Sequence, residues 1–521
     1  MNDMKILDCT LRDGGYVNNW AWGFDNAKAV IGLLTKAKVD FVEVGFLRNV
    51  DGYNKDITVC NTIEELNRLL PEKNGNTVYS AMAMCSNFDI NKLTPYSGKG
   101  IEMIRVTAHD DDIEEGLKFA KQVKERGYKL SINPINIMGY SDERLLWILK
   151  QVNEIQPYQF SIVDTFGSMK RRDLDRIVSI VDNNLNRNIR VALHLHENMA
   201  LSCCLAQQFA DKHLNRPVAI DGSLLGMGRI PGNLPIELIA DYLNDYLDKT
   251  YDIDYMMDAI QDYIAPLKGK SEWGYTPAYF LSAKYNLHRN YAEFYLNKGD
   301  LSNRDINHIL ASYDKSKATI FDSKYADMKY EEYKNNIIDD SETYKNLQNS
   351  IKGKNILLLA PGNTITKESA KIQKFIDSEK PLVMSVNFIP EQFRCDYAFF
   401  SNGRRFSQIS DEKCKLIVTS NVQTEQEVFK VNYNRLSNAF EQGFNSYIMA
   451  LKLLSDLGIE KVTVAGADGY KDELNDYYKA SMKSSSVHSG DYNVLVERAV
   501  DRIGIEVTYL TESAYEHRRE Q

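Results

Sequence analysis

Three side chains in the first half of the chain have the types and the spacing of metal ligands. His194 and His196 form an H-x-H pair in "HLHEN", and Asp13 follows the apolar run of "ILDCTLRDGG". On a strand, residues i and i+2 face the same side, so both imidazoles can point to one spot. One carboxylate and two imidazoles suit a divalent ion that must also hold substrate oxygens. Together they predict a divalent-metal site, if the fold brings their strands together.

Each feature has a structural alternative when it is taken alone. An H-x-H pair on a strand can serve packing, and the adjacent Arg12 and Asp13 can form a local surface ion pair. Because both features lie where strands of the same predicted rim end, the metal site is the favoured interpretation.

The first half of the chain alternates between short β-rich runs and amphipathic helical segments such as "SDERLLWILKQVNEI". About eight such units between residue 4 and about residue 245 are typical of a (β/α)8 TIM barrel, and a doubly wound open sheet is the alternative. In the barrel, Asp13 follows the first strand and the histidines lie on the seventh. The expected strands lie in 4–9, 40–46, 77–84, 101–107, 128–134, 158–164, 189–196 and 217–223.

The rest of the chain divides into two further parts. Residues 251–345 are rich in Tyr, Asp, Asn and Lys and indicate a helical extension that ends in a linker. Residues 346–521 show a second strand-and-helix pattern with six β-like runs, which predicts a Rossmann-like domain. The predicted organisation is therefore a barrel over 1–250, a helical extension over 251–345 and a Rossmann-like domain over 346–521.

Composition narrows the classes of partner. The formal net charge of −9 argues against nucleic acid or an anionic membrane as the main partner. No apolar run approaches the roughly 18–20 residues of a membrane span, and the N-terminus has no secretion signal. Seven cysteines without C-x-x-C spacing fit reduced thiols in a cytoplasmic protein. Association into a homo-oligomer is left open.

The segments "DCTLRDGG", "HLHEN" and "DGSLLGMGRIPGN" resemble three signatures of the DRE-TIM metallolyase superfamily. This group includes 4-hydroxy-2-oxovalerate aldolases, hydroxymethylglutaryl-CoA lyase and isopropylmalate synthases, and the aldolase branch is the nearest. The resemblance implies that Asp13, His194 and His196 bind Mn²⁺ or Mg²⁺, with Asn233 as a further ligand. A loop asparagine that makes an Asx turn is the alternative for Asn233. Glu43 would face the barrel interior and pair with Arg12.

The chemistry that the resemblance implies explains why an arginine stands beside the metal aspartate. A 2-oxo acid chelates a metal through its carboxylate and keto oxygens, and cleavage beyond C3 leaves an enolate on the keto oxygen. The Arg12 guanidinium would supply donors for that oxyanion while Asp13 anchors the ion. The second substrate would be an aldehyde or a sugar. An acyl-CoA-dependent Claisen condensation on the same metal site is an alternative. A Schiff-base aldolase would instead need a barrel lysine, for which Lys129 is the candidate.

The chain departs from the aldolase pattern at Tyr16. In the aldolases, a histidine three residues beyond the metal aspartate is the catalytic base, and an unperturbed tyrosine is a poor base at neutral pH. The base then comes from elsewhere, such as His109, or Tyr16 acts as an acid or a positioning donor, or the site binds without turnover. A helpful tyrosine after the barrel corresponds to Tyr275 or Tyr279, of which Tyr275 is the predicted one.

The C-terminal part resembles bacterial sialyltransferases that use CMP-sugars and the related domain of motif-accessory proteins. The resemblance rests on "MSVN", "KVTVAGADGY" and "VHSGDYNVLVERAVDRIGIEVTYL". It implies a site for CMP or another nucleotide-sugar, in an enzyme of surface-polysaccharide metabolism. A second alternative follows from it: a barrel without catalysis fused to a glycosyltransferase. The predicted nucleotide-binding residues are Gly362, Asn363, Asn387, Asp468 and His488.

Overall fold

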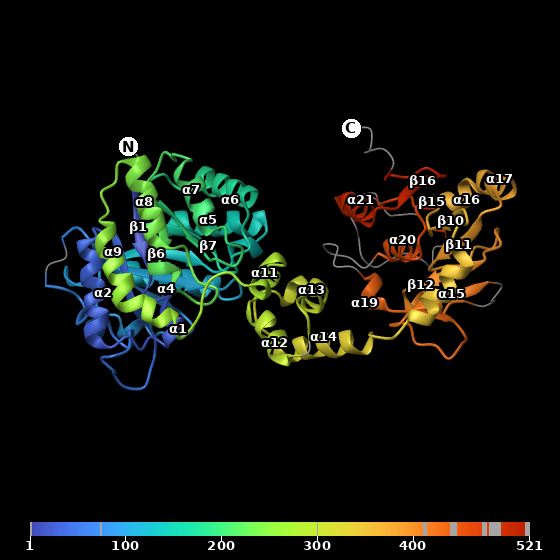
Figure 1. The fold of residues 1–521 in the computed structure, drawn as a ribbon. Helices are drawn as coiled ribbons and strands as arrows, with labels where there is room; N and C mark the ends of the chain where they lie inside the picture. The colour runs from blue at the N-terminus through green and yellow to red at the C-terminus, as the bar shows by residue number, and fades with distance from the viewer. Residues whose placement is uncertain are drawn as a thin grey trace. The chain divides into compact units, whose positions relative to one another are not determined.

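A computed structural model describes residues 3–72, 75–299, 301–409, 414–437, 445–470, 477–478 and 491–515. The chain forms two compact units (Figure 1). The first comprises Met1–Asn297 with Lys315–Phe321, and the second comprises Lys298–Asp314 with Asp322–Gln521. The predicted three-part division, with boundaries after residues 250 and 345, stays a prediction.

The first unit contains a closed parallel barrel of eight strands, which confirms the predicted TIM barrel. Its first strand pairs with both the second and the last, so the sheet closes and the alternative of an open sheet is excluded. A short additional strand, β3 (Val59–Cys60), pairs with the carboxyl end of the second barrel strand. The barrel strands are β1 (Met4–Asp8), β2 (Phe41–Leu47), β4 (Val78–Met84), β5 (Met103–Ala108), β6 (Lys129–Pro134), β7 (Gln159–Asp164), β8 (Arg190–Leu195) and β9 (Val218–Gly222).

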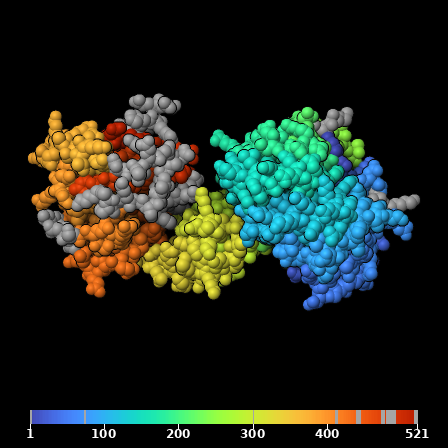
Figure 2. All heavy atoms as spheres, turned by 180° about the vertical axis from the view of Figure 1, so that it is seen from behind, coloured from blue at the N-terminus to red at the C-terminus, as the bar shows by residue number. Residues whose placement is uncertain are grey.

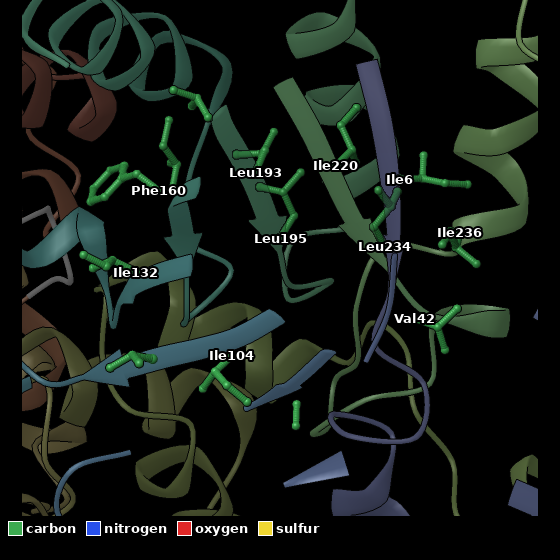
Figure 3. Close-up of a cluster of buried hydrophobic side chains, with 14 of the residues drawn as sticks. Ile6, Val42, Ile104, Ile132, Phe160, Leu193, Leu195, Ile220, Leu234 and Ile236 are labelled. Carbon is green, nitrogen blue, oxygen red and sulfur yellow. The ribbon is translucent and has the colours of Figure 1, made fainter. Parts of the chain in front are cut away.

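Helices cover the outside of this barrel because the outward residues of the strands are apolar. Figure 3 shows such side chains, among them Ile6, Ile104 and Leu193, which are fully buried. Figure 2 shows the blue-to-green atoms of this unit as a filled surface on the face seen from behind. The helices are α1 (Gly15–Asn18), α2 (Phe24–Lys36), α3 (Ile63–Asn67), α4 (Ile113–Glu125), α5 (Asp142–Ile155), α6 (Arg171–Asn184), α7 (Ser202–Ala210) and α8 (Ile236–Leu247), with 3₁₀ turns η1 (Ile90–Lys92), η2 (Ile137–Gly139) and η3 (Leu224–Gly226).

Short helices follow the barrel, as the composition of residues 251–345 predicts. The segment expected to end as a linker contains two of these helices, α14 and α15. Asp322 is the N-cap residue of α14, and Asp340 is the N-cap residue of α15. The helices are α9 (Ile253–Ala259), α10 (Ala265–Lys268), α11 (Pro277–Lys284), α12 (Asn290–Lys298), α13 (Asn303–Ala311), α14 (Ser323–Asn335) and α15 (Ser341–Ile351), with one π turn, η4 (Ile260–Ile264), and one 3₁₀ turn, η5 (Lys315–Lys317).

The second unit contains a parallel sheet of seven strands in the order β14-β13-β12-β11-β10-β15-β16. The order reverses between β10 and β15, which is the switch point of a doubly wound fold. The strands are β10 (Ile356–Leu359), β11 (Leu382–Val386), β12 (Tyr397–Phe400), β13 (Lys415–Thr419), β14 (Phe429–Val431), β15 (Lys461–Ala465) and β16 (Glu506–Tyr509). The helices are α16 (Thr364–Lys367), α17 (Ser369–Glu379), α18 (Gly403–Phe406), α19 (Tyr433–Leu436), α20 (Ser446–Asp456) and α21 (Asp491–Ile503).

This second sheet confirms the predicted Rossmann-like architecture, but the pattern missed β14. Only three residues form that strand, and its Lys430 breaks the apolar run. Among the described residues, no helix is long and apolar enough to cross a membrane.

Candidate metal centre

The interior of the barrel is polar, and the alternation of β8 shows why. In "RVALHL", Val191, Leu193 and Leu195 belong to the apolar core outside the barrel. With a side-chain period of two, His194 must face the interior, and His196, one residue beyond the strand, follows on the same side. The same alternation places charged side chains of β2, β5 and β9 inside the barrel.

The barrel brings Asp13, His194 and His196 together. One ligand atom from each lies within 4.8 Å of the others. Nε2 of His196 lies 3.7 Å from Oδ2 of Asp13, which is buried and has no hydrogen-bond partner in the described structure. Nδ1 of His196 lies 2.9 Å from the carbonyl oxygen of Asp164 and donates to it, which leaves the Nε2 lone pair for a metal. An orphaned carboxylate oxygen and a correctly oriented imidazole fit a divalent cation.

Asn233 lies beside the same cluster. It forms an isolated backbone bridge with His196, and its Nδ2 donates to the carbonyl oxygen of Met227 at 3.3 Å. Its Oδ1 is buried without a partner in the described structure. A methyl group added at Gly228 would lie 2.8 Å from Asn233 Cγ and 3.0 Å from Asp13 Oδ2, so the two side chains border one small space. These positions are consistent with Asn233 as a fourth ligand, which stays a prediction.

A continuous network of buried ion pairs contacts two of the candidate ligands, Asp13 and His194. Arg12 reaches Asp13 with Nη1 at 2.5 Å and Glu43 with Nε at 2.6 Å. Arg105 donates to the same Glu43 oxygen at 3.1 Å and pairs with Asp221. Asp221 in turn lies 3.3 Å from Nδ1 of His194. Sequence reasoning placed Glu43 beside Arg12, and the structure does the same.

The net charge of this network favours a bound cation. Two guanidinium groups, Arg12 and Arg105, face three carboxylates, Asp13, Glu43 and Asp221, so the network carries a net charge of −1 with neutral imidazoles. Burial opposes the charge on Asp13, but Arg12 and the two histidines hold the pKa of its carboxyl well below the usual range. Burial lowers the pKa of His194, which keeps this imidazole neutral. Neutral imidazoles and an ionised carboxylate are the ligand forms that metals bind.

We expect Arg105→Met to destabilise the first unit strongly. The change leaves the buried carboxylates of Glu43 and Asp221 each without the arginine that pairs with it from β5, and breaking a buried pair costs about 3–5 kcal/mol. All four tryptophans, at positions 20, 22, 147 and 273, lie in this unit, so tryptophan fluorescence during urea unfolding measures it separately.

Lys129→Met is the matched control, because Lys129 pairs with Glu102 at 2.5 Å where both side chains are about one third exposed. An exposed pair of this kind contributes about 0–1 kcal/mol. Equal losses of free energy of unfolding for the two variants would contradict the role assigned to the buried network.

A cavity of about 130 Å³ is lined by all three candidate metal ligands. Tyr16 lies at its border with 37% of its surface exposed, and its hydroxyl accepts a hydrogen bond from Nη2 of Arg48 at 3.3 Å. The lining residues are Arg12, Asp13, Tyr16, Phe46, Arg48, Met82, Met84, Arg105, Thr107, Asn133, Ile135, Val163, Thr165, Phe166, His194, His196, Asn198, Arg229, Ile230, Pro231, His288 and Arg289.

Other residues singled out in the sequence lie away from this cavity lining. Tyr275 is 53% exposed, whereas Tyr279 is buried and donates to Glu293 at 2.7 Å, and neither lines the cavity. His109 follows β5 at the same rim but does not line the cavity either. Lys129 begins β6, at the opposite end of the strand from the site. The predicted catalytic role of Tyr275 therefore has no geometric support from this arrangement and stays a prediction.

Sequence reasoning missed several residues of the site. Arg105 and Asp221 carry the ion-pair network, and Arg48, Arg229 and His288 line the cavity. A signal existed for Arg105, because a lone arginine inside "EMIRVTA" interrupts an otherwise apolar strand. His288 and Arg289 come from the segment between α11 and α12, and no local pattern connects that segment with the barrel rim.

His288 predicts a dependence of stability on pH. Burial, followed by Arg229 and Arg289, lowers the pKa of His288 from 6.5 to about 3. Between about pH 6.5 and about pH 3, the unfolded chain therefore binds a proton at His288 that the folded chain does not. The free energy of unfolding falls as the pH falls through this window. Glutamine does not titrate, so His288→Gln should lose less free energy of unfolding than the wild type when the pH is lowered from about 7.5 to about 5. Urea unfolding followed by tryptophan fluorescence tests this, and an equal difference at both pH values would refute it.

Four of the five predicted nucleotide-binding residues, Gly362, Asn363, Asn387 and Asp468, follow the carboxyl ends of strands in the second unit. Gly362 follows β10 and donates its N–H to the carbonyl oxygen of Gly466 at 2.8 Å, while Asp468 accepts the N–H of Thr364 at 3.1 Å. Asn363 precedes α16, and Asn387 donates to Ser446 Oγ at 2.6 Å. The structure therefore brings Gly362 and Asp468 into contact at the switch point. His488 lies outside the described residues.

Comparisons with known proteins concern mainly the barrel. A family model described as HMGL-like matches residues 3–262. An oxaloacetate decarboxylase of Mycobacterium tuberculosis is 23% identical over 237 residues, which are 44% of this chain and 67% of the relative. A 4-hydroxy-2-oxovalerate aldolase of Pseudoalteromonas translucida is 23% identical over 237 residues, which are 45% of this chain and 67% of the relative. Among solved structures, the N-terminal domain of a proposed aldolase from Bacteroides vulgatus has a TM-score of 0.47 at 25% identity and covers 56% of this chain and 96% of its own.

Proposed function

We propose that the protein is a metal-dependent lyase of the aldolase type, whose barrel matches the HMGL-like family model over residues 3–262. It makes or breaks a carbon–carbon bond next to a 2-oxo acid such as pyruvate. The observation that carries the proposal is the convergence of Asp13, His194 and His196 within 4.8 Å, above the buried ion pairs of Arg12. The two relatives compared above are an aldolase and a decarboxylase of 2-oxo acids by name.

The proposed cofactor is Mn²⁺ or Mg²⁺, held by Asp13, His194 and His196 with Asn233 as a further ligand. A bound divalent cation would act as a Lewis acid toward the keto oxygen of the substrate. Oxygen ligands from Asp13 and Asn233 suit these hard cations, and the two imidazoles favour Mn²⁺ over Mg²⁺.

Arg12 would stabilise the charge that develops on the substrate. Its Nε and Nη1 are held by Glu43 and Asp13, while Nη2 makes no hydrogen bond in the described structure and the residue lines the cavity. When the C3–C4 bond of a 4-hydroxy-2-oxo acid breaks, its electron pair would remain as an enolate. The hydroxyl proton would pass to solvent water as the aldehyde forms, and the enolate would take a proton from water to give pyruvate. A donor that is fixed before the reaction needs no reorganisation to meet that enolate.

Tyr16 would act on the hydroxyl that becomes the aldehyde oxygen. Because Arg48 already donates to Oη of Tyr16, the phenolic hydrogen is directed elsewhere and is available to the substrate. In the direction of bond formation, this hydrogen bond would polarise the aldehyde. Tyr16 is therefore proposed as a donor rather than as a replacement for the histidine base of the aldolases.

A pyruvate assay coupled to lactate dehydrogenase tests the proposal. With Mn²⁺ present, we expect pyruvate release from a set of 4-hydroxy-2-oxo acids above the rate without protein. Oxaloacetate belongs in the set, because loss of CO2 from it leaves the same enolate. Release of free thiol from acetyl-CoA, without pyruvate from any hydroxy-oxo acid, would instead support the Claisen alternative.

For the second unit, we propose a nucleotide or nucleotide-sugar site at the switch point between β10 and β15. In doubly wound sheets, ligands bind outside the carboxyl ends of the strands at such a point. Gly362 and Asp468 lie there, and burial raises the pKa of the Asp468 carboxyl. The proposed ligand is CMP or a CMP-sugar, and calorimetric titration with CMP tests it. Binding that Asp468→Ala leaves unchanged would contradict the site.

A further inference from the structure

The cavity lining contains three arginines whose positive charge the proposed lyase chemistry does not use. They are Arg48, which follows β2, Arg229, which follows η3, and Arg289, which precedes α12. Within the described residues, Arg48 and Arg229 form no ion pair with a carboxylate. Arg289 lies 3.5 Å from the carboxylate of Glu293, with which it forms an ion pair. Asp13 is the only acidic residue in the cavity lining. This part of the cavity therefore has an excess of positive charge.

These arginines form one connected group around Tyr16 and His288. Arg48 donates to the Tyr16 hydroxyl, and the Arg229 guanidinium lies 5.5 Å from the centre of the Tyr16 ring. Nη2 of Arg229 lies 3.2 Å from Nε2 of His288. Nη1 of Arg289 donates to the carbonyl oxygen of Ile230 at 2.5 Å, directly beside Arg229. We call Arg48, Arg229, His288 and Arg289 the arginine subsite.

The arginine subsite has more hydrogen-bond donors than acceptors. Nε of Arg48 and Nε of Arg289 are buried without a partner in the described structure. Both ring nitrogens of His288 face donors, since Nε2 faces Arg229 and Nδ1 lies 3.2 Å from the N–H of Asn290. A neutral imidazole has one accepting nitrogen, so one of these two donors is left unsatisfied. Buried donors without acceptors are costly, and a ligand with several acceptor oxygens would satisfy them.

We propose that the arginine subsite binds a phosphate group at the far end of the substrate. The inference rests on the proposed function: the metal ligands and Arg12 take the carboxylate and keto oxygens of the 2-oxo acid, which leaves the arginine subsite for the aldehyde part. The substrate is then a 4-hydroxy-2-oxo acid with a terminal phosphate, made from pyruvate and a phosphorylated aldehyde. A phosphate dianion matches two unpaired guanidinium groups better than a carboxylate, which a single arginine can satisfy bidentately.

Binding of inorganic phosphate to the full chain in EDTA tests this without any metal or turnover. Calorimetry or ³¹P line broadening should show saturable binding to the wild type. Arg229→Gln and Arg48→Gln should each weaken it by about tenfold or more, because each removes a charge-assisted bond. Arg172→Gln is the matched control, since Arg172 is exposed on α6 outside the cavity, and it should bind phosphate as the wild type does. Glyceraldehyde 3-phosphate should compete with phosphate, whereas glyceraldehyde should not.

Three results would overturn the inference. They are no phosphate binding by the wild type, equal binding by Arg229→Gln, and acetate binding as tight as phosphate binding. Asp13→Asn separates this inference from the proposed function, because it should remove Mn²⁺ binding and keep phosphate binding in EDTA. With Mn²⁺ restored, Arg229→Gln should lower kcat/KM for the phosphorylated 4-hydroxy-2-oxo acid by about tenfold or more beyond any loss for the unphosphorylated acid.

Discussion

Replacing Asp13 with asparagine is expected to abolish Mn²⁺ binding and lyase activity together. The change keeps the shape of the side chain but removes its negative charge, and Oδ2 of Asp13 is the buried oxygen without a partner in the described structure that lies 3.7 Å from Nε2 of His196. Loss of a residue that merely supports a metal ligand costs about 10–100-fold in affinity, so loss of a ligand should cost more than about 100-fold. Calorimetric titration with Mn²⁺ and the pyruvate assay measure the two effects.

Asp175→Asn is the matched control for this variant. Asp175 lies on α6 with about half of its side chain exposed, and it pairs with Lys212. Its replacement should leave Mn²⁺ affinity and activity unchanged. His488→Ala adds a discriminating arm: if this change abolishes sugar transfer from a CMP-sugar while Asp13→Asn leaves all measurable activity untouched, the barrel is a docking module and the lyase proposal fails.

Arg12→Lys is expected to reduce catalysis far more than metal binding. Arg12 contacts Asp13 and Glu43 at once through two nitrogens and leaves the third for the cavity. A lysine keeps the charge, but its single ammonium group cannot reproduce this planar fork. Removing one fixed donor to a developing oxyanion costs about 10²–10³ in kcat, and we expect a loss of that size. Mn²⁺ affinity should fall by no more than about 10–100-fold.

Saturating Mn²⁺ separates the two effects of Arg12→Lys, because it restores occupancy without restoring the donor. Activity that returns to the wild-type value at high Mn²⁺ would show that Arg12 only positions Asp13. Lys129 supplies no alternative chemistry, because it begins β6 at the other end of the barrel and pairs with Glu102. Lys129→Met should therefore keep its activity, which the same pyruvate assay checks.

Local patterns predicted the barrel because its strands bury one apolar face. Each of the eight predicted runs contains an observed strand or most of one, from β1 to β9. The strands that the pattern missed, β3 and β14, have two and three residues, too few for a period to be recognised. The helices of 323–335 and 341–351 lie in a segment interpreted as a linker, because their exposed faces are charged and their buried faces narrow.

The sequence by itself determined which side chains could bind a metal. His194 and His196 share a face through the period of a strand, and Asp13 follows the first strand of the same barrel. Only the tertiary structure decided what surrounds them. Glu43, Arg105 and Asp221 come from three different strands and meet inside the barrel, and the arginine subsite combines residues that follow β2 and η3 with residues that precede α12. Periodicity reports which face a residue occupies, but ion pairs between strands depend on how the sheet closes, which no local pattern contains.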